Sequence, residues 1–80
     1  MIAIEFDEQA CVVTIAGRPA ALRSLAQRLE RLAERAELGR PELDHLYSAE
    51  WAGADLATMS PDPASRATVV HHVRLHGLPA

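Results

Sequence analysis

The chain has 80 residues, 49% of them apolar, and its eight arginines face eleven acidic residues, so its formal net charge is -3. This length allows a single domain over residues 1–80, and the lack of a basic excess counts against binding to nucleic acid or to an anionic membrane. With fifteen alanines, ten leucines and three aromatic residues, the core must consist of small aliphatic side chains, and a large internal substrate cavity is not expected.

Two runs with a period of two, over 2–6 and 11–15, open the chain. Each run predicts a half-buried strand, and folding them about a short turn sets Ile4 opposite Val13, which leaves one apolar face. Cys11 then points inward among valines, where a thiol acts as an inert small hydrophobe.

A single cysteine cannot form an internal disulfide, so we expect a reducing, cytoplasmic location. The N-terminus shows no basic segment followed by a long apolar one, and no run approaches the roughly 18 apolar residues that a membrane span requires.

A helix is expected to start at Pro19, which suits a first helical turn, and to stop at Gly39. Its apolar stripe recurs at steps of three and four residues: Leu22, Leu25, Leu29, Leu32 and Ala36. The flanks differ in sign, with Arg28, Arg31 and Arg35 on one side and Glu30, Glu34 and Glu37 on the other. The flanks form either an ordinary solvated face or a polarised docking surface.

Two further strands are expected, over 42–48 and 67–76. In the first, Leu43 and Tyr47 share a face with His45, and Leu46 lies on the other face; the pattern does not say which is buried. In the second, one alternating set is more apolar than the other and is expected to face the interior: Val69, His71, Val73 and Leu75.

The connection 49–66 is too long and too apolar at its start for an ordinary loop. Either 55–60 forms one more strand, or Trp51, Leu56 and Met59 form a docking loop. Pro61 and Pro63 make its second half a true connection.

The element order β-β-α-β-(β)-β predicts an α+β, two-layer domain, with a mostly antiparallel sheet of four to five strands and one long amphipathic helix on one face. One helix covers one face, so the other is expected to stay open, with Ala3, Val12, Thr14 and Val70 upon it, and with Leu46 if its side of the strand is the uncovered one. Because so short a chain is hard to stabilise alone, a homodimer through that face or an edge strand is the first candidate for covering it.

Histidines are the residues that most suggest chemistry. His71 and His72 point to opposite faces of a strand, and His72 and His76 are about 13 Å apart at roughly 3.3 Å per residue. Only a cross-strand pair of His45 with one of the first two could share an ion. No nucleophile elbow, phosphate loop or zinc-binding helix motif occurs, so no metal, cofactor or catalytic set is expected and the chain is interpreted as a non-enzyme.

Trp51, the single tryptophan, is either the plug of a small satellite core or a binding anchor. Arg74 and His76 lie on the outward face of a possible edge strand and could supply polar rim contacts. The candidate partner-binding residues are Trp51, Leu56, Met59, His72, Arg74, His76, Val12 and Val70.

Over about residues 2–48, the order of hairpin, Gly17-Arg18-Pro19 helix start, leucine-rich helix and His45-Leu46 strand resembles the small bacterial immunity proteins of polymorphic toxin systems, of the immunity protein 32 type. The resemblance implies a cognate inhibitor that binds and blocks a protein toxin encoded next to it. Two alternatives remain: a homodimeric structural or regulatory domain without a toxin partner, and a small His-dependent, metal-binding enzyme.

Overall fold

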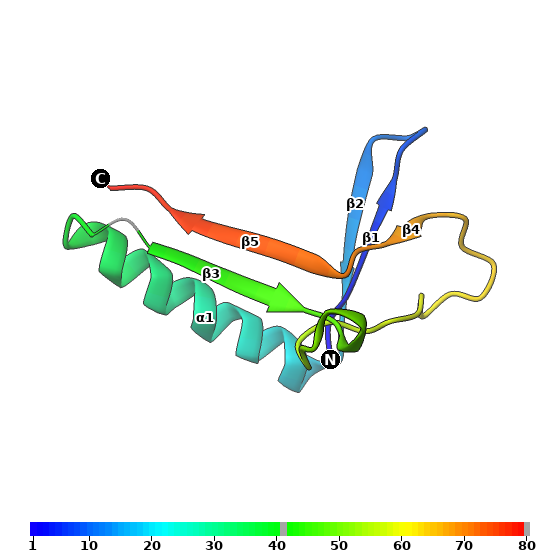
Figure 1. The fold of residues 1–80 in the computed structure, drawn as a ribbon, viewed down its shortest axis with the longest axis horizontal. Coiled ribbons are helices and arrows are strands. Elements are labelled where there is room, and N and C mark those ends of the chain that lie inside the picture. The colour runs from blue at the N-terminus through cyan, green and yellow to red at the C-terminus, as the bar shows by residue number, and fades with distance from the viewer. Residues whose placement is uncertain (41, 80) are drawn as a thin grey trace.

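The computed structural model describes residues 1–40 and 42–79 and contains one long helix and five strands (Figure 1). The elements are β1 (Ala3–Asp7), β2 (Val12–Ala16), α1 (Pro19–Glu37), β3 (Glu42–Tyr47), the short 3-10 helix η1 (Ala49–Trp51), β4 (Thr68–Val69) and β5 (His72–Gly77). The strands form two antiparallel sheets, β2-β1-β4 and β3-β5. The α+β class and the antiparallel pairing are thereby confirmed, with the strands divided between two sheets instead of one.

The β1-β2 hairpin has the expected apolar face in a shifted register. Ile4 lies opposite Ile15, not Val13, because the turn is longer than the expected two residues. The Asp7 carboxylate accepts hydrogen bonds from the backbone N–H groups of the second and third residues after it, both at 3.1 Å, and so stabilises the longer turn. Cys11 lies in this turn with φ 53° and is exposed. The prediction of an inward-facing Cys11 is therefore wrong.

Helix α1 begins at Pro19 and ends two residues before Gly39, whose φ of 77° suits only a residue without a side chain. Only the C-terminal part of its stripe is buried, at Leu32 and Ala36. There β5 approaches closely, since a Cβ on Gly77 would lie 3.2 Å from both of these side chains.

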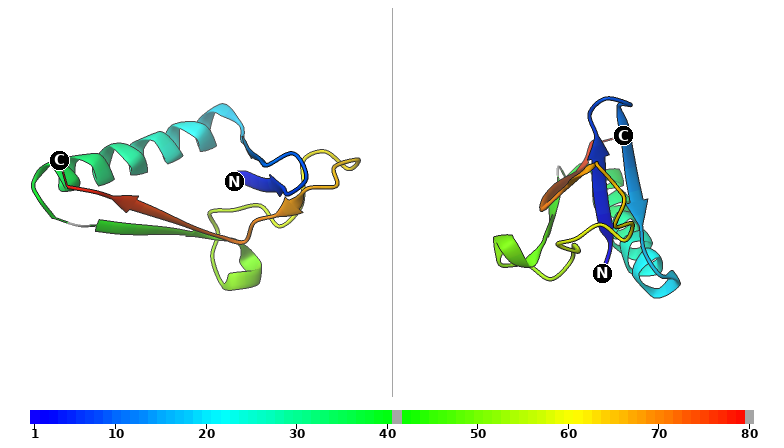
Figure 2. Two further views of the ribbon diagram at one scale, coloured as in Figure 1. Left: turned by 90° about the horizontal axis from the view of Figure 1, so that it is seen from above. Right: turned by 90° about the vertical axis from the view of Figure 1, so that its right-hand side faces the viewer.

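β3 and β5 form a two-stranded ribbon with α1 packed along one side, so that helix and ribbon make two layers (Figure 2). The ribbon face toward the helix carries Leu46 and its cross-strand partner Val73, and Leu46 is buried. The structure thus decides that the Leu46 face of β3 is the covered one.

The expected strand over 67–76 is interrupted where the chain passes from one sheet to the other. On one side of the break, the Val70 N–H donates to the Ile4 carbonyl at 2.8 Å, which extends the β1 pairing. On the other side, the Ser48 N–H donates to the His71 carbonyl at 2.9 Å, which extends the β3 pairing. The interruption therefore comes from a change of partner strand.

Leu56 joins the two sheets. Its neighbours exchange backbone hydrogen bonds with Ile2 at 3.2 and 2.7 Å, and its own N–H donates to the Tyr47 carbonyl at 3.1 Å. The side chain is fully buried in a cluster with Ile2, Ile4 and Leu46. The connection 49–66 therefore forms no strand over 55–60, and Leu56 does not belong to a docking loop.

The uncovered apolar surface differs from the expected one. Ala3 and Leu46, assigned to the open face, are buried, and on the Ala3 side of β1 the buried Glu5 accepts a hydrogen bond from Ser65 at 3.1 Å. Val12 and Thr14 are exposed as expected. Exposed apolar surface also lies on the hairpin face expected to be covered, because α1 runs along the ribbon and away from the hairpin (Figure 1). We call Phe6, Val13 and Ile15 the apolar hairpin face.

Candidate partner-binding site

The ribbon face that points away from α1 carries six side chains in three directly opposed pairs. We call it the outer ribbon face: Leu43 opposite His76, His45 opposite Arg74, and Tyr47 opposite His72. Directly opposed residues in an antiparallel pair share a face, so this alternation places all six together. None of the six carries a carboxylate.

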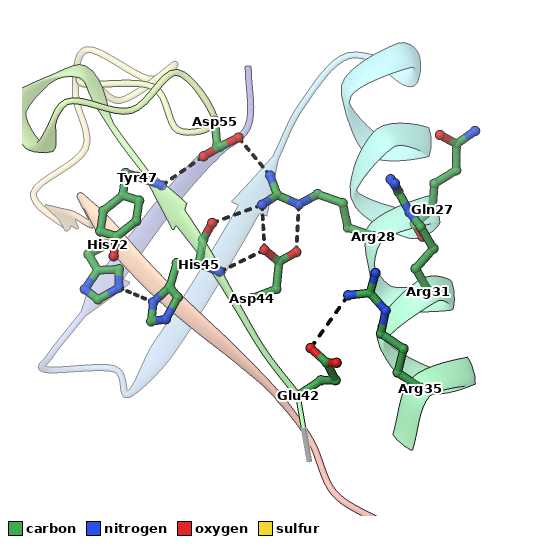
Figure 3. Close-up of polar contacts among 10 residues, drawn as sticks. All are labelled: Gln27, Arg28, Arg31, Arg35, Glu42, Asp44, His45, Tyr47, Asp55 and His72. Atoms are coloured by element: carbon green, nitrogen blue, oxygen red, sulfur yellow. Dashed lines mark hydrogen bonds and ion pairs between the residues drawn. The ribbon is translucent and has the colours of Figure 1, made fainter. Parts of the chain in front are cut away.

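Four rings follow one another across this surface at small interplanar angles. Tyr47 lies over His72 with ring centroids 4.5 Å apart and planes 9° apart, and His45 lies beside Tyr47 at 5.7 Å. Nδ1 of His45 is 2.9 Å from Nε2 of His72, so these rings share a hydrogen bond (Figure 3). Trp51 extends the row, with its ring centroid 6.2 Å from that of His72. Contact between rings restricts their rotamers, so the surface is ordered before any partner binds.

Trp51 is held by backbone contacts to the end of β3. Its N–H and that of Gly53 both donate to the Ser48 carbonyl at 2.9 Å. The Ser48 hydroxyl is itself buried and 2.7 Å from Nδ1 of His71. The Trp51 residue nevertheless stays 60% exposed, so an anchored backbone presents a large accessible ring.

The opposite side of β3 is held to the helix by Arg28. Its guanidinium donates to both Asp44 carboxylate oxygens at 2.8 Å, to Asp55 at 2.8 Å and to the His45 carbonyl at 3.0 Å (Figure 3). The bond to Arg28 lowers the pKa of Asp44, and the same bond raises that of Arg28. Both groups therefore remain charged.

These contacts bear directly on the strand that carries the rings. Asp44 also accepts the N–H of His45 at 2.9 Å, and Asp55 accepts that of Tyr47 at 3.2 Å. The Arg28 cluster thereby positions the backbone from which two of the outer rings project.

The arginine flank of α1 is thus largely occupied within the fold. Arg28 binds Asp44 and Asp55, and Arg35 lies 3.6 Å from Glu42. The groove between α1 and β3 is lined by three arginines, but these carboxylates balance most of its charge. The opposite flank, which comprises Glu30, Glu34 and Glu37, is exposed. Docking on either flank stays a prediction.

The eight candidate contact residues do not share one surface. Four lie on or beside the outer ribbon face: Trp51, His72, Arg74 and His76. The remaining four are dispersed, with Leu56 buried, Met59 exposed in the 57–66 segment, Val12 exposed on β2 and Val70 packed against the core. The structure adds His45, Tyr47 and Leu43 to the surface. Their alternation with Leu46 was visible in the sequence, but the pairing of β3 with β5 was needed to place them beside His72 and Arg74.

The cross-strand histidine pair considered as a metal site does form, between His45 and His72, while His71 bonds to Ser48. Within residues 1–40 and 42–79, no group of three or more His, Cys, Asp or Glu side chains is placed to hold a metal ion. His45 and His72 share a hydrogen bond across the two strands in an edge-to-edge contact.

These features define a single-helix α+β protein with a row of four neighbouring rings, three on one face of its β3-β5 ribbon and the fourth, Trp51, exposed beside it. A family model for immunity protein 32 matches residues 12–73, more than half of the chain, so the chain belongs to this family. The match confirms the resemblance to this family and covers residues 12–48 of the stretch that carries it, and it continues through η1 and β4 into β5. Comparisons with curated proteins and with solved structures give no match. None of the helices in the described ranges has the length and apolar character needed to cross a membrane.

Proposed function

We propose that this protein is a non-catalytic immunity protein, which neutralises a cognate bacterial toxin in the cytoplasm by binding it directly and occluding its active surface. Membership of the immunity protein 32 family is the observation that carries the proposal. Occlusion requires a rigid surface and no catalytic group, because a bound protein blocks access by its bulk alone.

The outer ribbon face has the composition expected of such a surface. Trp, Tyr and Arg dominate the residues whose truncation costs most at protein interfaces, and all three occur here, at Trp51, Tyr47 and Arg74. Their order before binding limits the entropy lost on association.

The test is co-expression with the toxin encoded beside this gene. We expect the protein to restore growth of cells that produce the toxin, and to form a complex with the purified toxin domain at a one-to-one ratio. Absence of both complex and rescue contradicts the proposal. An immunity protein that rescues growth but modifies the toxin covalently, as seen by mass spectrometry, would instead contradict the non-catalytic mechanism.

A homodimer is the second candidate, and the apolar hairpin face favours it. Val13 and Ile15 are 59% and 51% exposed, and Leu22 and Leu29 on the helix are also exposed. With about 200 Å² for a free large apolar residue, Phe6, Val13 and Ile15 together leave on the order of 300 Å² uncovered. This is less than half of the roughly 800 Å² that each partner buries in a standard interface, so the apolar hairpin face can supply the centre of a dimer interface.

The dimer is tested by light scattering at roughly 50 µM, where a mass twice that of the 8.7 kDa chain is expected. Val13→Arg should give a monomer. Thr14→Arg changes the neighbouring exposed residue on the opposite hairpin face, where it lies across from Glu5, and should leave the dimer intact. A monomeric wild-type protein at this concentration contradicts the dimer.

A further inference from the structure

The charges of the β3-β5 ribbon are sorted between its two faces. Both carboxylates of β3, Glu42 and Asp44, face α1, where they bind Arg35 and Arg28. The outer ribbon face carries Arg74 and three histidines instead. A chain with a net charge of -3 therefore has one face whose strand residues include an arginine and no carboxylate.

This sorting follows from how the ribbon packs. The helix flank that meets β3 supplies arginines, so the β3 residues that point toward it are acidic and make charge-assisted hydrogen bonds. Because successive residues of a strand point to opposite faces, the outward-facing residues do not meet the arginines of α1. Arg74 is accordingly exposed, and the described contacts give it no carboxylate partner on this face.

Such a face attracts a partner of opposite charge. Complementary potentials speed encounter and reject wrong partners, whereas aromatic anchors in the middle of the surface supply most of the affinity. The carboxylate of Glu50, next to Trp51 in the chain, lies 3.6 Å from Nε2 of His71.

We propose that the outer ribbon face, with Trp51 as its anchor, binds the toxin, and that it docks on an acidic patch of the toxin surface. This inference rests on the proposed function and names the surface and the charge of its partner. The competing surface is the glutamate flank of α1, which would suit a basic patch.

The experiment measures the affinity of purified variants for the toxin domain encoded beside this gene. Trp51→Ala should weaken binding by about 30-fold or more, as loss of an interface anchor does. Arg74→Glu should weaken it at least ~10-fold by placing like charges together, and Arg74→Gln should lose less. The control, Glu34→Arg, changes an exposed charge on the competing flank, and a distant exposed charge should alter binding by no more than ~2-fold at physiological salt.

Salt provides a second readout. Raising ionic strength from about 0.05 to about 0.5 M should weaken wild-type binding and reduce the difference between wild type and Arg74→Glu, because screening acts on the charged contact. Both changed residues are exposed, and matched circular dichroism and melting curves will show that the variants fold.

The outcomes separate the two proposals. If the wild-type protein does not bind this toxin, the proposed function fails and this inference fails with it. If the wild-type protein binds but tolerates Trp51→Ala and Arg74→Glu, the outer ribbon face is not the docking surface, although the immunity function stands. Loss of binding in Glu34→Arg alone would assign the glutamate flank, and tighter binding in Arg74→Glu would overturn the acidic patch.

Discussion

Replacing Arg28 by glutamine should cost more stability than any other change of a charged residue on α1. The substitution removes the guanidinium that donates four hydrogen bonds of 2.8–3.0 Å to Asp44, Asp55 and the His45 carbonyl. It leaves two carboxylates side by side without their shared cation. Both carboxylates also accept hydrogen bonds from backbone N–H groups of β3. Loss of the guanidinium therefore weakens the position of the strand as well as that of the side chains.

The magnitude lies between two known limits. Exposed ion pairs contribute about 0.2–1 kcal/mol, whereas breaking a fully buried pair costs about 3–5 kcal/mol. The Arg28 and Asp44 side chains are 26% and 33% exposed, and the contact is bidentate. We therefore expect Arg28→Gln to lower the free energy of unfolding by about 2–3 kcal/mol. Arg28→Lys, which keeps the charge but loses the planar fork, should cost about 1 kcal/mol.

The assay is urea unfolding followed by circular dichroism, with thermal melting as a second measure. At about 4–8 °C per kcal/mol for a chain of this size, the Tm of Arg28→Gln should fall by roughly 10–20 °C. Arg31→Gln is the matched control, since Arg31 makes only a 3.4 Å bond within its own helix, and it should change stability by less than about 0.5 kcal/mol.

The pH dependence gives an independent check. Because the pKa of Asp44 is lowered in the folded protein, its contribution is complete above the unfolded value of about 3.9 and disappears as the pH falls through the lower folded value. The stability difference between wild type and Arg28→Gln should therefore shrink in strong acid. Two results would refute the role assigned to Arg28. One is that Arg28→Gln loses no more stability than Arg31→Gln at pH 7; the other is that the stability difference between wild type and Arg28→Gln grows in acid.

Three further predictions concern the segments that join the elements. Leu56→Ala should lower the free energy of unfolding by about 3–5 kcal/mol, because it leaves a cavity at the fully buried junction of the two sheets. Met59 is exposed, so Met59→Ala should lower it by less than about 0.5 kcal/mol. Similar urea midpoints for the two variants would exclude a junction at Leu56. Gly53→Ala should lower the free energy of unfolding by about 2 kcal/mol or more, since its Cβ would lie 2.6 Å from the carbonyl oxygen at the end of β3. The neighbouring Ala52→Gly should raise it by about 0.5–1 kcal/mol, because φ at Ala52 is 63°. Melting temperatures that shift in the same direction for both variants would contradict this backbone conformation. Cys11 should react fully with a thiol reagent in the native protein, and protection until unfolding would show that it is not in the exposed turn.

The helix and the composition of each strand face follow from the sequence alone. Pro19, the leucine stripe and Gly39 determine α1 because each acts within a turn or two of the chain. The strict alternation of residues along β3 and β5 likewise groups His45 with Tyr47, and Leu46 on the other side. Periodicity is a local property, so these features need no knowledge of distant contacts.

Other local patterns were less decisive. The alternation alone predicts a hairpin with a two-residue turn, and no Asn-Gly or Asp-Gly pair marks the turn type in the sequence. A shift of two residues keeps the same side chains on the apolar face, so hydrophobic patterning cannot distinguish the two registers. The Asp7 side chain stabilises the longer turn, which places Cys11 at a φ of 53°.

Only the tertiary structure decided which faces are covered. Periodicity says which side chains lie together but not what packs upon them, and here α1 follows the β3-β5 ribbon and leaves the apolar hairpin face exposed. The change of partner strand at Val70 and His71 and the burial of Leu56 between two sheets depend on contacts between segments far apart in the chain. The row of rings at the outer ribbon face also depends on tertiary contacts. Its rings come from three separate segments, which meet only when β3 pairs with β5.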